Sequence, residues 1–216
     1  MHVLFDVNGT LLDPGGLTAA WEGAPRGVGL RVLDDAVAQS MVDTMTGVFR
    51  PFAEYLRSAL AARAAVLGLG EDAVRAGVEA AAALPAYPDA ADALARLKLA
   101  GATLAAVTNS AADAARSALR DAGLLDCFHA VVGADAVGAY KPDPRVYRRA
   151  LDDLAVPARE TWFVAGHWWD VAGAAYAGLK TAWASRTDLA YPAAMPQPDV
   201  RGKDIAEVAE AILRSA

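Results

Sequence analysis

Polar side chains stand at the ends of several apolar segments of this chain and in the loop before residue 144. They form four groups: Asp6 with Gly9 and Thr10; Thr108, Asn109 and Ser110; Lys141 with Pro142; and the run from His167 to Asp170. Because open α/β sheets bind ligands beyond the carboxyl ends of their strands, we expect the groups to converge on one site. Singly, each has a structural explanation as a helix cap or a solvated charge. Together they favour a shared site.

Asp6 is the candidate nucleophile. It stands near the end of the apolar run 2–7, and Gly9 and Thr10 follow it in a turn that lets backbone and ligand approach closely. A carboxylate at the mouth of a sheet can attack a substrate and form a covalent intermediate. On this segment alone the competing explanation, an aspartate that caps a helix after a strand, is equally open.

Apolar runs and helical periodicity alternate through most of the chain. We expect strands at residues 2–7, 103–108, 130–133, 161–165 and 181–184, and helices at residues 89–100, 111–122, 144–154, 171–177 and 205–213. Regular alternation of this kind predicts an α/β fold in which a parallel sheet carries helices on both faces.

The segment between the first two strands has a different character. Residues 14–29 are rich in Pro and Gly and predict a loop, whereas residues 30–84 show apolar residues at helical spacing and no strand pattern. We therefore predict a core domain made of residues 1–14 and 86–216, with residues 15–85 inserted as a helical cap domain. The alternative is that these helices belong to the core itself.

Composition indicates which binding partners and which cellular location we expect for this protein. The formal net charge is -6 and no basic stripe is visible, so we expect no nucleic-acid partner. The single cysteine, Cys127, excludes an internal disulfide and a cysteine-rich zinc site. No basic leader precedes the first strand and no apolar stretch reaches about 18 residues, so we expect a cytoplasmic protein without a membrane segment.

The order of the polar motifs resembles the four motifs of the haloacid dehalogenase (HAD) superfamily. These motifs are Phe5-Asp6-Val7-Asn8-Gly9-Thr10-Leu11, then Thr108-Asn109, then Lys141-Pro142, then a loop with an aspartate after the fourth strand. With the inserted cap, the resemblance covers nearly the whole chain. It implies a three-layer α/β/α, Rossmann-like (HAD-like) core, an aspartyl nucleophile at Asp6 and a small-molecule substrate.

Two motif positions differ from those of the phosphatase branch of the superfamily. Phosphatase members carry an acid/base aspartate two residues after the nucleophile, where this chain has Asn8, and an amide cannot protonate a leaving alkoxide. They also bind magnesium through a Gly-Asp-x-x-x-Asp loop, whose first carboxylate is replaced here by Gly166 or His167. Mg²⁺ would therefore be the cofactor only under a phosphatase alternative.

The second branch, the type II 2-haloacid dehalogenases, needs no metal or other cofactor. The run from Trp169 to Ala174 is similar to its Trp-Asp-x-x-Gly-Ala signature. The resemblance implies that Asp6 displaces halide through an ester intermediate, that Lys141 orients the Asp6 carboxylate, and that Asp170 positions or deprotonates the hydrolytic water. Asn8 is compatible with this chemistry, because a halide leaves without a proton.

The same resemblance implies roles for the remaining polar residues. Thr10, Thr108 and Asn109 would supply hydrogen bonds around the nucleophile. His167 and Trp169 would form the pocket wall and the halide cradle.

One position departs from the dehalogenase pattern. Dehalogenases of this type bind the substrate carboxylate with an arginine on the first cap helix. Aligning the cap on residues 47–52 places that arginine at residues 33–35, which are Leu, Asp and Asp in this chain. The two carboxylates at this place would repel an anionic acid and could not bind it. Arg31 lies about one turn earlier on the same predicted helix, so it is the candidate substitute.

Three functions therefore remain open from the sequence. The first is a metal-independent hydrolase of the 2-haloacid dehalogenase type. The second is a magnesium-dependent small-molecule phosphatase, and the third is a weakly catalytic binding protein with the same fold. A homodimer is also possible, since the apolar cap helices can pack on a second copy as well as on their own core.

Overall fold

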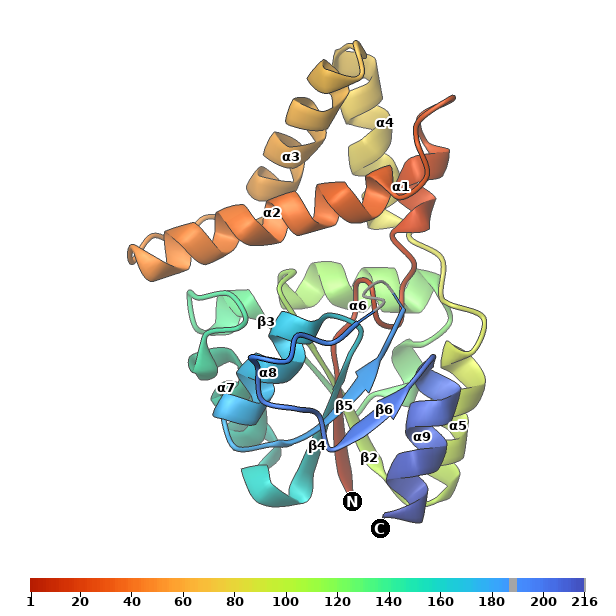
Figure 1. Cartoon of the computed structure of the whole chain (residues 1–216), viewed down its shortest axis with the longest axis vertical. Helices are drawn as coiled ribbons and strands as arrows, with labels where there is room; N and C mark the ends of the chain where they lie inside the picture. The colour runs from red at the N-terminus through yellow and green to blue at the C-terminus, as the bar shows by residue number, and fades with distance from the viewer. Residues whose placement is uncertain (187–189, 216) are drawn as a thin grey trace.

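The computed structural model describes residues 1–186 and 190–215. It consists of a sheet flanked by helices and, beyond one edge of that sheet, a group of helices that projects away from it (Figure 1). The N-terminus lies at the far end of the molecule from these projecting helices (Figure 1).

Six parallel strands form the sheet, in the order β3-β2-β1-β4-β5-β6. Their bounds are His2–Phe5 (β1), Thr103–Thr108 (β2), Ala130–Gly133 (β3), Thr161–Ala165 (β4), Lys180–Ala184 (β5) and Val200–Gly202 (β6). The predicted α/β fold is confirmed, but the sheet has one strand more than expected. β6 is a short edge strand without a buried residue, so it has no apolar run that the sequence could reveal.

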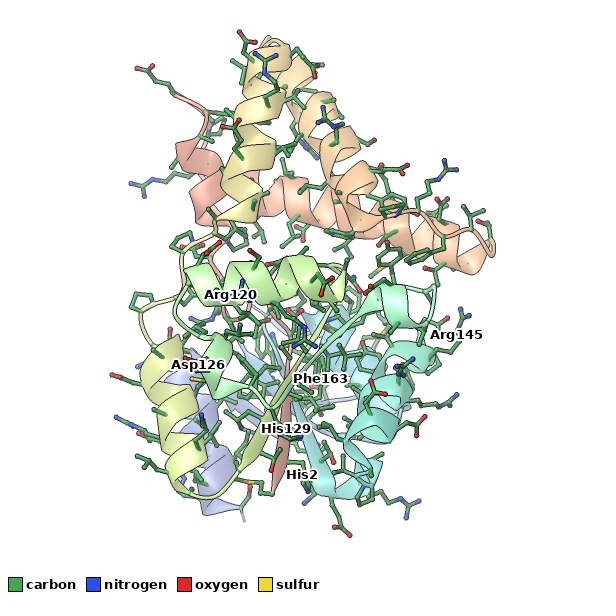
Figure 2. All side chains as sticks on the ribbon, turned by 180° about the vertical axis from the view of Figure 1, so that it is seen from behind. His2, Arg120, Asp126, His129, Arg145 and Phe163 are labelled. Carbon is green, nitrogen blue, oxygen red and sulfur yellow. The ribbon has the colours of Figure 1, made fainter. Side chains whose placement is uncertain are left out.

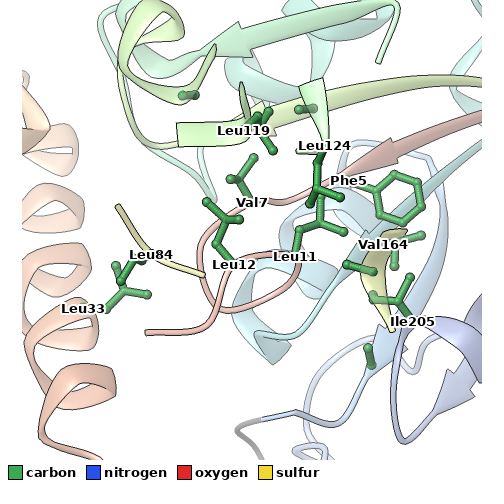
Figure 3. Close-up of a cluster of buried hydrophobic side chains, with 14 of the residues drawn as sticks. Phe5, Val7, Leu11, Leu12, Leu33, Leu84, Leu119, Leu124, Val164 and Ile205 are labelled. Carbon is green, nitrogen blue, oxygen red and sulfur yellow. The ribbon is translucent and has the colours of Figure 1, made fainter. Parts of the chain in front are cut away.

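Helices cover both faces of the sheet, as the alternation of side chains along a strand requires. Val3 and Phe5 belong to the core on one face, with helices α5 (Ala90–Leu99), α6 (Ala112–Asp121) and α9 (Ile205–Arg214). Leu4 belongs to the core on the other face, with α7 (Pro144–Leu154) and α8 (Trp168–Tyr176). Figure 3 shows part of the first core. Short 3₁₀ turns lie at Leu125–Cys127 (η1), Ala134–Ala136 (η2) and Ala158–Glu160 (η3).

Four helices between β1 and α5 form the projecting group, and we call them the cap helices. They are α1 (Gly15–Ala19), α2 (Val28–Met45), α3 (Phe52–Val66) and α4 (Glu71–Ala82). α2 runs across the top of the core, and α3 and α4 rise from it (Figure 1). The proposed boundaries of a separate cap domain remain a prediction.

α1 lies in a segment for which the composition predicts a loop, and that prediction was wrong for residues 15–19. Gly29 allows close packing of α2 against α1. A Cβ on Gly29 of α2 would come within 2.1 Å of the carbonyl oxygen of Pro14, and the Gly29 N–H donates to Thr18 Oγ1 at 3.0 Å. A helix contact of this kind leaves no trace in the local sequence pattern.

α8 begins at Trp168, three residues before the helix that the sequence predicts. Its first turn therefore contains Asp170, where a carboxylate interacts favourably with the positive end of the helix dipole. The sequence shows no capping signal here, since His167 at the N-cap makes no capping hydrogen bond. As a result, a helix and not a loop fixes Trp169 and Asp170.

The longest described helix is α2, with 18 residues, and charged side chains interrupt it. Within residues 1–186 and 190–215, no helix combines the length and apolar character needed to cross a bilayer. The predicted cytoplasmic location, homodimer and lack of a nucleic-acid partner remain predictions.

Candidate active site

Asp6 directly follows β1 at the carboxyl edge of the sheet, and its carboxylate is held on both oxygens. Its backbone N–H donates to the carbonyl of Val164 on β4 at 3.0 Å, which continues the sheet by one step. Lys141 Nζ donates to Oδ1 at 2.7 Å, and the hydroxyl of Thr10 donates to Oδ2 at 2.6 Å. The side chain is 7% exposed, so little more than one edge of the carboxylate is open to a ligand.

Lys141 lies at the centre of the site with all three of its ammonium donors occupied. Besides Asp6 it donates to Asp170 Oδ2 at 2.6 Å and to the carbonyl of Val107 at 3.0 Å. An ammonium carries three donors, so none remains for a ligand. The backbone N–H of Lys141 donates to Asn109 Oδ1 at 2.8 Å, which ties this loop to the end of β2.

Asp170 is fully buried and shares Lys141 with the candidate nucleophile. The hydroxyl of Tyr147 on α7 donates to its other oxygen, Oδ1, at 2.5 Å. Burial, reinforced by the nearby Asp6 charge, raises the pKa of Asp170 to about 6, although Lys141 and Tyr147 act in the opposite direction. Asp170 is thus a carboxylate that can take a proton near neutral pH.

The other two charges of this cluster stay ionised. Burial alone would raise the pKa of Asp6, but the ammonium of Lys141 and the nearby His167 outweigh it, so the pKa lies well below its usual range. Burial would likewise lower the pKa of Lys141, but the carboxylates of Asp170 and Asp6 outweigh it and raise the pKa. At neutral pH the site therefore holds an unprotonated nucleophile.

A tight turn after Asp6 brings the first and last motifs together. Gly9 has φ +81°, which favours glycine, and a Cβ there would come within 2.4 Å of the His167 ring. The backbone N–H of Gly166 donates to Thr10 Oγ1 at 2.8 Å, and this hydroxyl in turn donates to Asp6. The Gly-Thr sequence is thus needed for the turn and for the contact with β4.

A small cavity of about 20 Å³ lies over Asp6. The core lines it with Asp6, Asn8, Thr108, Asn109, His167 and Trp169, and the cap lines it with Leu33, Val37 and Phe52. The rings of His167 and Trp169 lie 5.3 Å apart with an interplanar angle of 30°. A larger cleft of about 390 Å³ between α3, α4 and α6 also contacts Asn8 and Phe52, so it adjoins the cavity.

The structure brings together nearly all the residues that the sequence singles out. Asp6, Thr10, Lys141 and Asp170 form one hydrogen-bonded cluster, and Asn8, Thr108, Asn109, His167 and Trp169 line the cavity above it. Asn8 is half-buried and its Nδ2 lies 3.4 Å from Ser110 Oγ. Arg31 is not brought there: it is exposed on α2 and does not line the cavity.

Tyr147 was missed by the sequence analysis, although it contacts Asp170. Nothing in its local pattern distinguishes it from an ordinary core tyrosine of an amphipathic helix. Two facts could have identified it as a site residue. It follows shortly after the Lys-Pro motif, and a buried tyrosine hydroxyl needs a hydrogen-bond partner.

The cluster does not fit a magnesium ion. Mg²⁺ prefers an octahedral set of oxygen ligands. Across the described ranges, no three His, Cys, Asp or Glu side chains gather in a way that could hold a metal. The Lys141 ammonium also lies between the two carboxylates, at 2.7 and 2.6 Å from them. We therefore derive no step through a metal, and the need for none remains a prediction.

Comparison with known proteins points to the same family as the motifs. (S)-2-haloacid dehalogenase 1 of Pseudomonas sp. (strain CBS-3) is 42% identical over 98 residues, a match that spans 45% of this chain and only 43% of that protein. The (S)-2-haloacid dehalogenase of Xanthobacter autotrophicus is 33% identical over 190 residues, covering 85% of this chain and 74% of that protein.

A solved structure supports the match over the full length. The L-2-haloacid dehalogenase from Xanthobacter autotrophicus with chloropropionic acid covalently bound has a TM-score of 0.90 at 25% identity, covering 100% of this chain and 99% of that one. A family profile described as haloacid dehalogenase-like hydrolase matches residues 1–178. The chain therefore belongs to the haloacid dehalogenase-like hydrolase family.

Proposed function

We propose that this chain is a metal-independent hydrolase that removes halide from small 2-haloacids, with Asp6 as the nucleophile. The observation that carries the proposal is the pairing of two buried carboxylates across one ammonium. Asp6 is held ionised, while burial gives Asp170 a pKa of about 6. Carboxylates whose pKa values are pushed apart suit one nucleophile and one base.

The first half-reaction is an SN2 displacement. An oxygen of Asp6 attacks the halogen-bearing carbon, the carbon–halogen bond breaks, and halide leaves with the bonding electrons, giving an ester. No proton is needed, so the neutral amide of Asn8 suffices where a phosphatase needs an acid. Lys141 and Thr10, at 2.7 and 2.6 Å, keep the carboxylate oriented for attack.

The second half-reaction hydrolyses the ester at the carbonyl carbon of Asp6. Water adds to that carbon and gives one proton to Asp170. The bond from that carbon to the ester oxygen then breaks, and this oxygen takes the proton from Asp170 to become the hydroxyl of the 2-hydroxyacid. The other water proton leaves the Asp6 carboxyl group for solvent, which restores the carboxylate. Lys141 and Thr10 donate to the Asp6 oxygens, so they stabilise the oxyanion that forms during this step. The configuration at carbon 2 is inverted once, in the first half-reaction.

Substrate entry requires movement of the cap helices. The cavity over Asp6, at about 20 Å³, holds roughly one water molecule and not a haloacid. Leu33, Val37 and Phe52 close it from the cap side, and the adjoining cleft of about 390 Å³ offers a route from solvent. A closed cavity also keeps the nucleophile away from competing reactions.

The first experiment measures halide release from fluoroacetate, chloroacetate and 2-chloropropionate in EDTA. A parallel assay uses an aryl phosphate with magnesium. We expect halide release and no phosphate release. A single turnover in ¹⁸O water should place the label in Asp6, which peptide mass spectrometry detects. Halide release with the label only in the product hydroxyl would contradict the covalent mechanism, and phosphate release alone would favour the phosphatase.

A further inference from the structure

The cavity over Asp6 contains a histidine whose ring nitrogens have no partner. His167 is 4% exposed, and neither Nδ1 nor Nε2 makes a hydrogen bond. Nδ1 lies 3.6 Å from Asp6 Oδ2, which is an ion-pair distance but too long for a hydrogen bond. Leaving a buried donor unsatisfied is costly, so such a group points to a ligand that is bound there during the reaction.

The charges of the site call for a further cation. Lys141 balances only one of the two carboxylates, Asp6 and Asp170, which leaves a net charge of -1 in a buried cluster. An anionic substrate next to this cluster would be repelled. Its carboxylate also cannot bind to Lys141, because the three ammonium donors are already used.

The described lining of the cavity supplies no other cation that could bind the substrate carboxylate. Among the described residues that line the cavity there is no lysine or arginine, and Leu33 occupies the cap side where a guanidinium is expected. Asn109 Nδ2 is also buried without a partner, but it is neutral. His167 can carry charge, and it lies where it is needed, because the carboxylate of a 2-haloacid is bonded directly to the carbon that Asp6 attacks from about 3–3.5 Å.

We propose that His167, as an imidazolium, is the anion-binding side chain of this site and replaces the missing cap arginine. The inference rests on the proposed function, and its ligand is a monoanion, either the substrate carboxylate or the departing halide. Protonation brings the summed charge of Asp6, Asp170, Lys141 and His167 to zero, and the charge of Asp34 on α2 lies outside this sum. The charged groups that face His167 are Asp6 and Asp170 from the core and Asp34 from α2, with Lys141 behind Asp6.

The electrostatic surroundings agree with this assignment. Burial alone would lower the pKa of His167, but the nearby carboxylates, Asp6 first, outweigh burial and raise it. Gly9 leaves the space that the ring occupies, since a Cβ at that position would meet the ring at 2.4 Å. The motif that carries the nucleophile therefore leaves room for the imidazole and favours its protonated form.

Nitrogen-15 NMR of imidazole-labelled protein tests the inference without turnover. The chain has three histidines. His2 and His129 lie in the part of the core away from the cap (Figure 2), so they serve as internal references. We expect the His167 signal to be that of an imidazolium at neutral pH and to shift on addition of propionate, of bromide, or of both. A response to propionate identifies the carboxylate as the ligand, and a response to bromide alone identifies the halide.

Kinetics of His167→Asn provide the second readout. Asparagine retains a donor but no charge, so we expect KM for 2-chloropropionate to rise at least tenfold if the carboxylate is bound, or inhibition by bromide to weaken tenfold if the halide is bound. His129→Asn, at an exposed position, is the control and should match wild type. Unchanged His2 and His129 signals will show that the variant is folded.

Failure of the inference is distinguishable from failure of the proposed function. If wild type releases no halide from any haloacid, the function is wrong, while the NMR titration still decides whether His167 binds an anion. If wild type releases halide but propionate and bromide leave the His167 signal unchanged, and KM and bromide inhibition of His167→Asn stay within twofold of wild type, His167 is not the clamp.

Discussion

The core and cap sides of the cavity over Asp6 differ in kind. The core side is a polar cluster in which Asp6, Lys141 and Asp170 pair over distances of 2.6 to 2.7 Å. The cap side offers only the apolar side chains of Leu33, Val37 and Phe52. Figure 3 shows Leu33 beside Leu84, across from Val7 and Leu12 of the core.

We infer from this difference that the core side carries out the reaction and that the cap side shapes the space for the substrate. The core holds the groups to which we assign the displacement and hydrolysis steps, and hydrogen bonds of 2.6 to 2.7 Å fix them in place. The cap excludes water and shapes the ligand, but it lines the cavity with no cation, and its Asp34 is negative. Affinity for an anion must therefore come from the core side, and the cap can be altered without loss of the chemistry. Five predictions test this division, beginning with the largest effect.

Removing the nucleophile should abolish the reaction. In Asp6→Asn the side chain keeps its shape but is a poor nucleophile, so we expect the rate of halide release to fall by about 10⁴-fold or more. Asp126→Asn, at an exposed position (Figure 2), is the matched control. Substantial halide release by folded Asp6→Asn, after correction for deamidation back to aspartate, would place the chemistry elsewhere.

Removing the shared ammonium should destabilise the core side of the cavity. Lys141→Met leaves the carboxylates of Asp6 and Asp170 buried together without a counter-charge, so we expect a loss of about 3–5 kcal/mol in the free energy of unfolding. Urea denaturation measures it. Lys203→Met removes an exposed lysine that pairs with Glu207 at 2.8 Å, and it should cost less than about 1 kcal/mol. Equal costs would mean that the buried pairs contribute little.

Removing the hydroxyl of Tyr147 should change the pH dependence of the reaction. Asp170 acts as a base when ionised, so activity should fall as the pH drops through about 6. The Tyr147 hydroxyl favours the ionised form, so Tyr147→Phe should raise the pKa of Asp170 and move this acid limb to higher pH. We expect a rate about tenfold lower at pH 6 and a smaller loss at pH 8. A parallel loss at all pH values would indicate a purely structural role.

Adding a cation to the cap should sharpen the contrast between the two sides. Leu33→Arg places a guanidinium on the apolar wall, and we expect KM for 2-chloropropionate to fall about tenfold with little change in kcat. The same change should rescue KM in the His167→Asn background. Leu33→Met controls for the altered side-chain shape. An unchanged KM in folded Leu33→Arg would show that the cap wall lies too far from the substrate carboxylate.

Removing metal ions should leave the rate of halide release unchanged, which is the smallest effect of the five. The described residues offer no set of oxygen ligands that suits magnesium, so halide release should be equal in EDTA and in added Mg²⁺. Equal initial rates over an EDTA titration will support this prediction. A loss in EDTA that magnesium restores would overturn it and reopen the phosphatase alternative.

The sequence predicted what depends on long apolar runs and on residues at strand ends. The strands 103–108, 130–133 and 161–165 were predicted with the observed bounds, and Asp6, Lys141 and Asp170 do converge. Features that arise from contacts between distant elements were missed. The Tyr147 hydroxyl meets Asp170 because α7 and α8 pack together, and α1 forms against α2. Arg31 could not be placed from the sequence, because helical spacing alone does not reveal which face of α2 meets the core.

The strand order has a consequence for how the chain matures during synthesis. β1 is made before its two neighbours in the sheet, β2 and β4, whose residues follow only after those of the cap helices. The Asp6 side chain meets its ammonium at Lys141 and its companion carboxylate at Asp170, later still. A nascent chain therefore carries Asp6 as a hydrated, unpaired charge at least until Lys141 has been made. The cluster of Asp6, Lys141 and Asp170 can form only once α8 has been made, so a chain truncated before α8 lacks it.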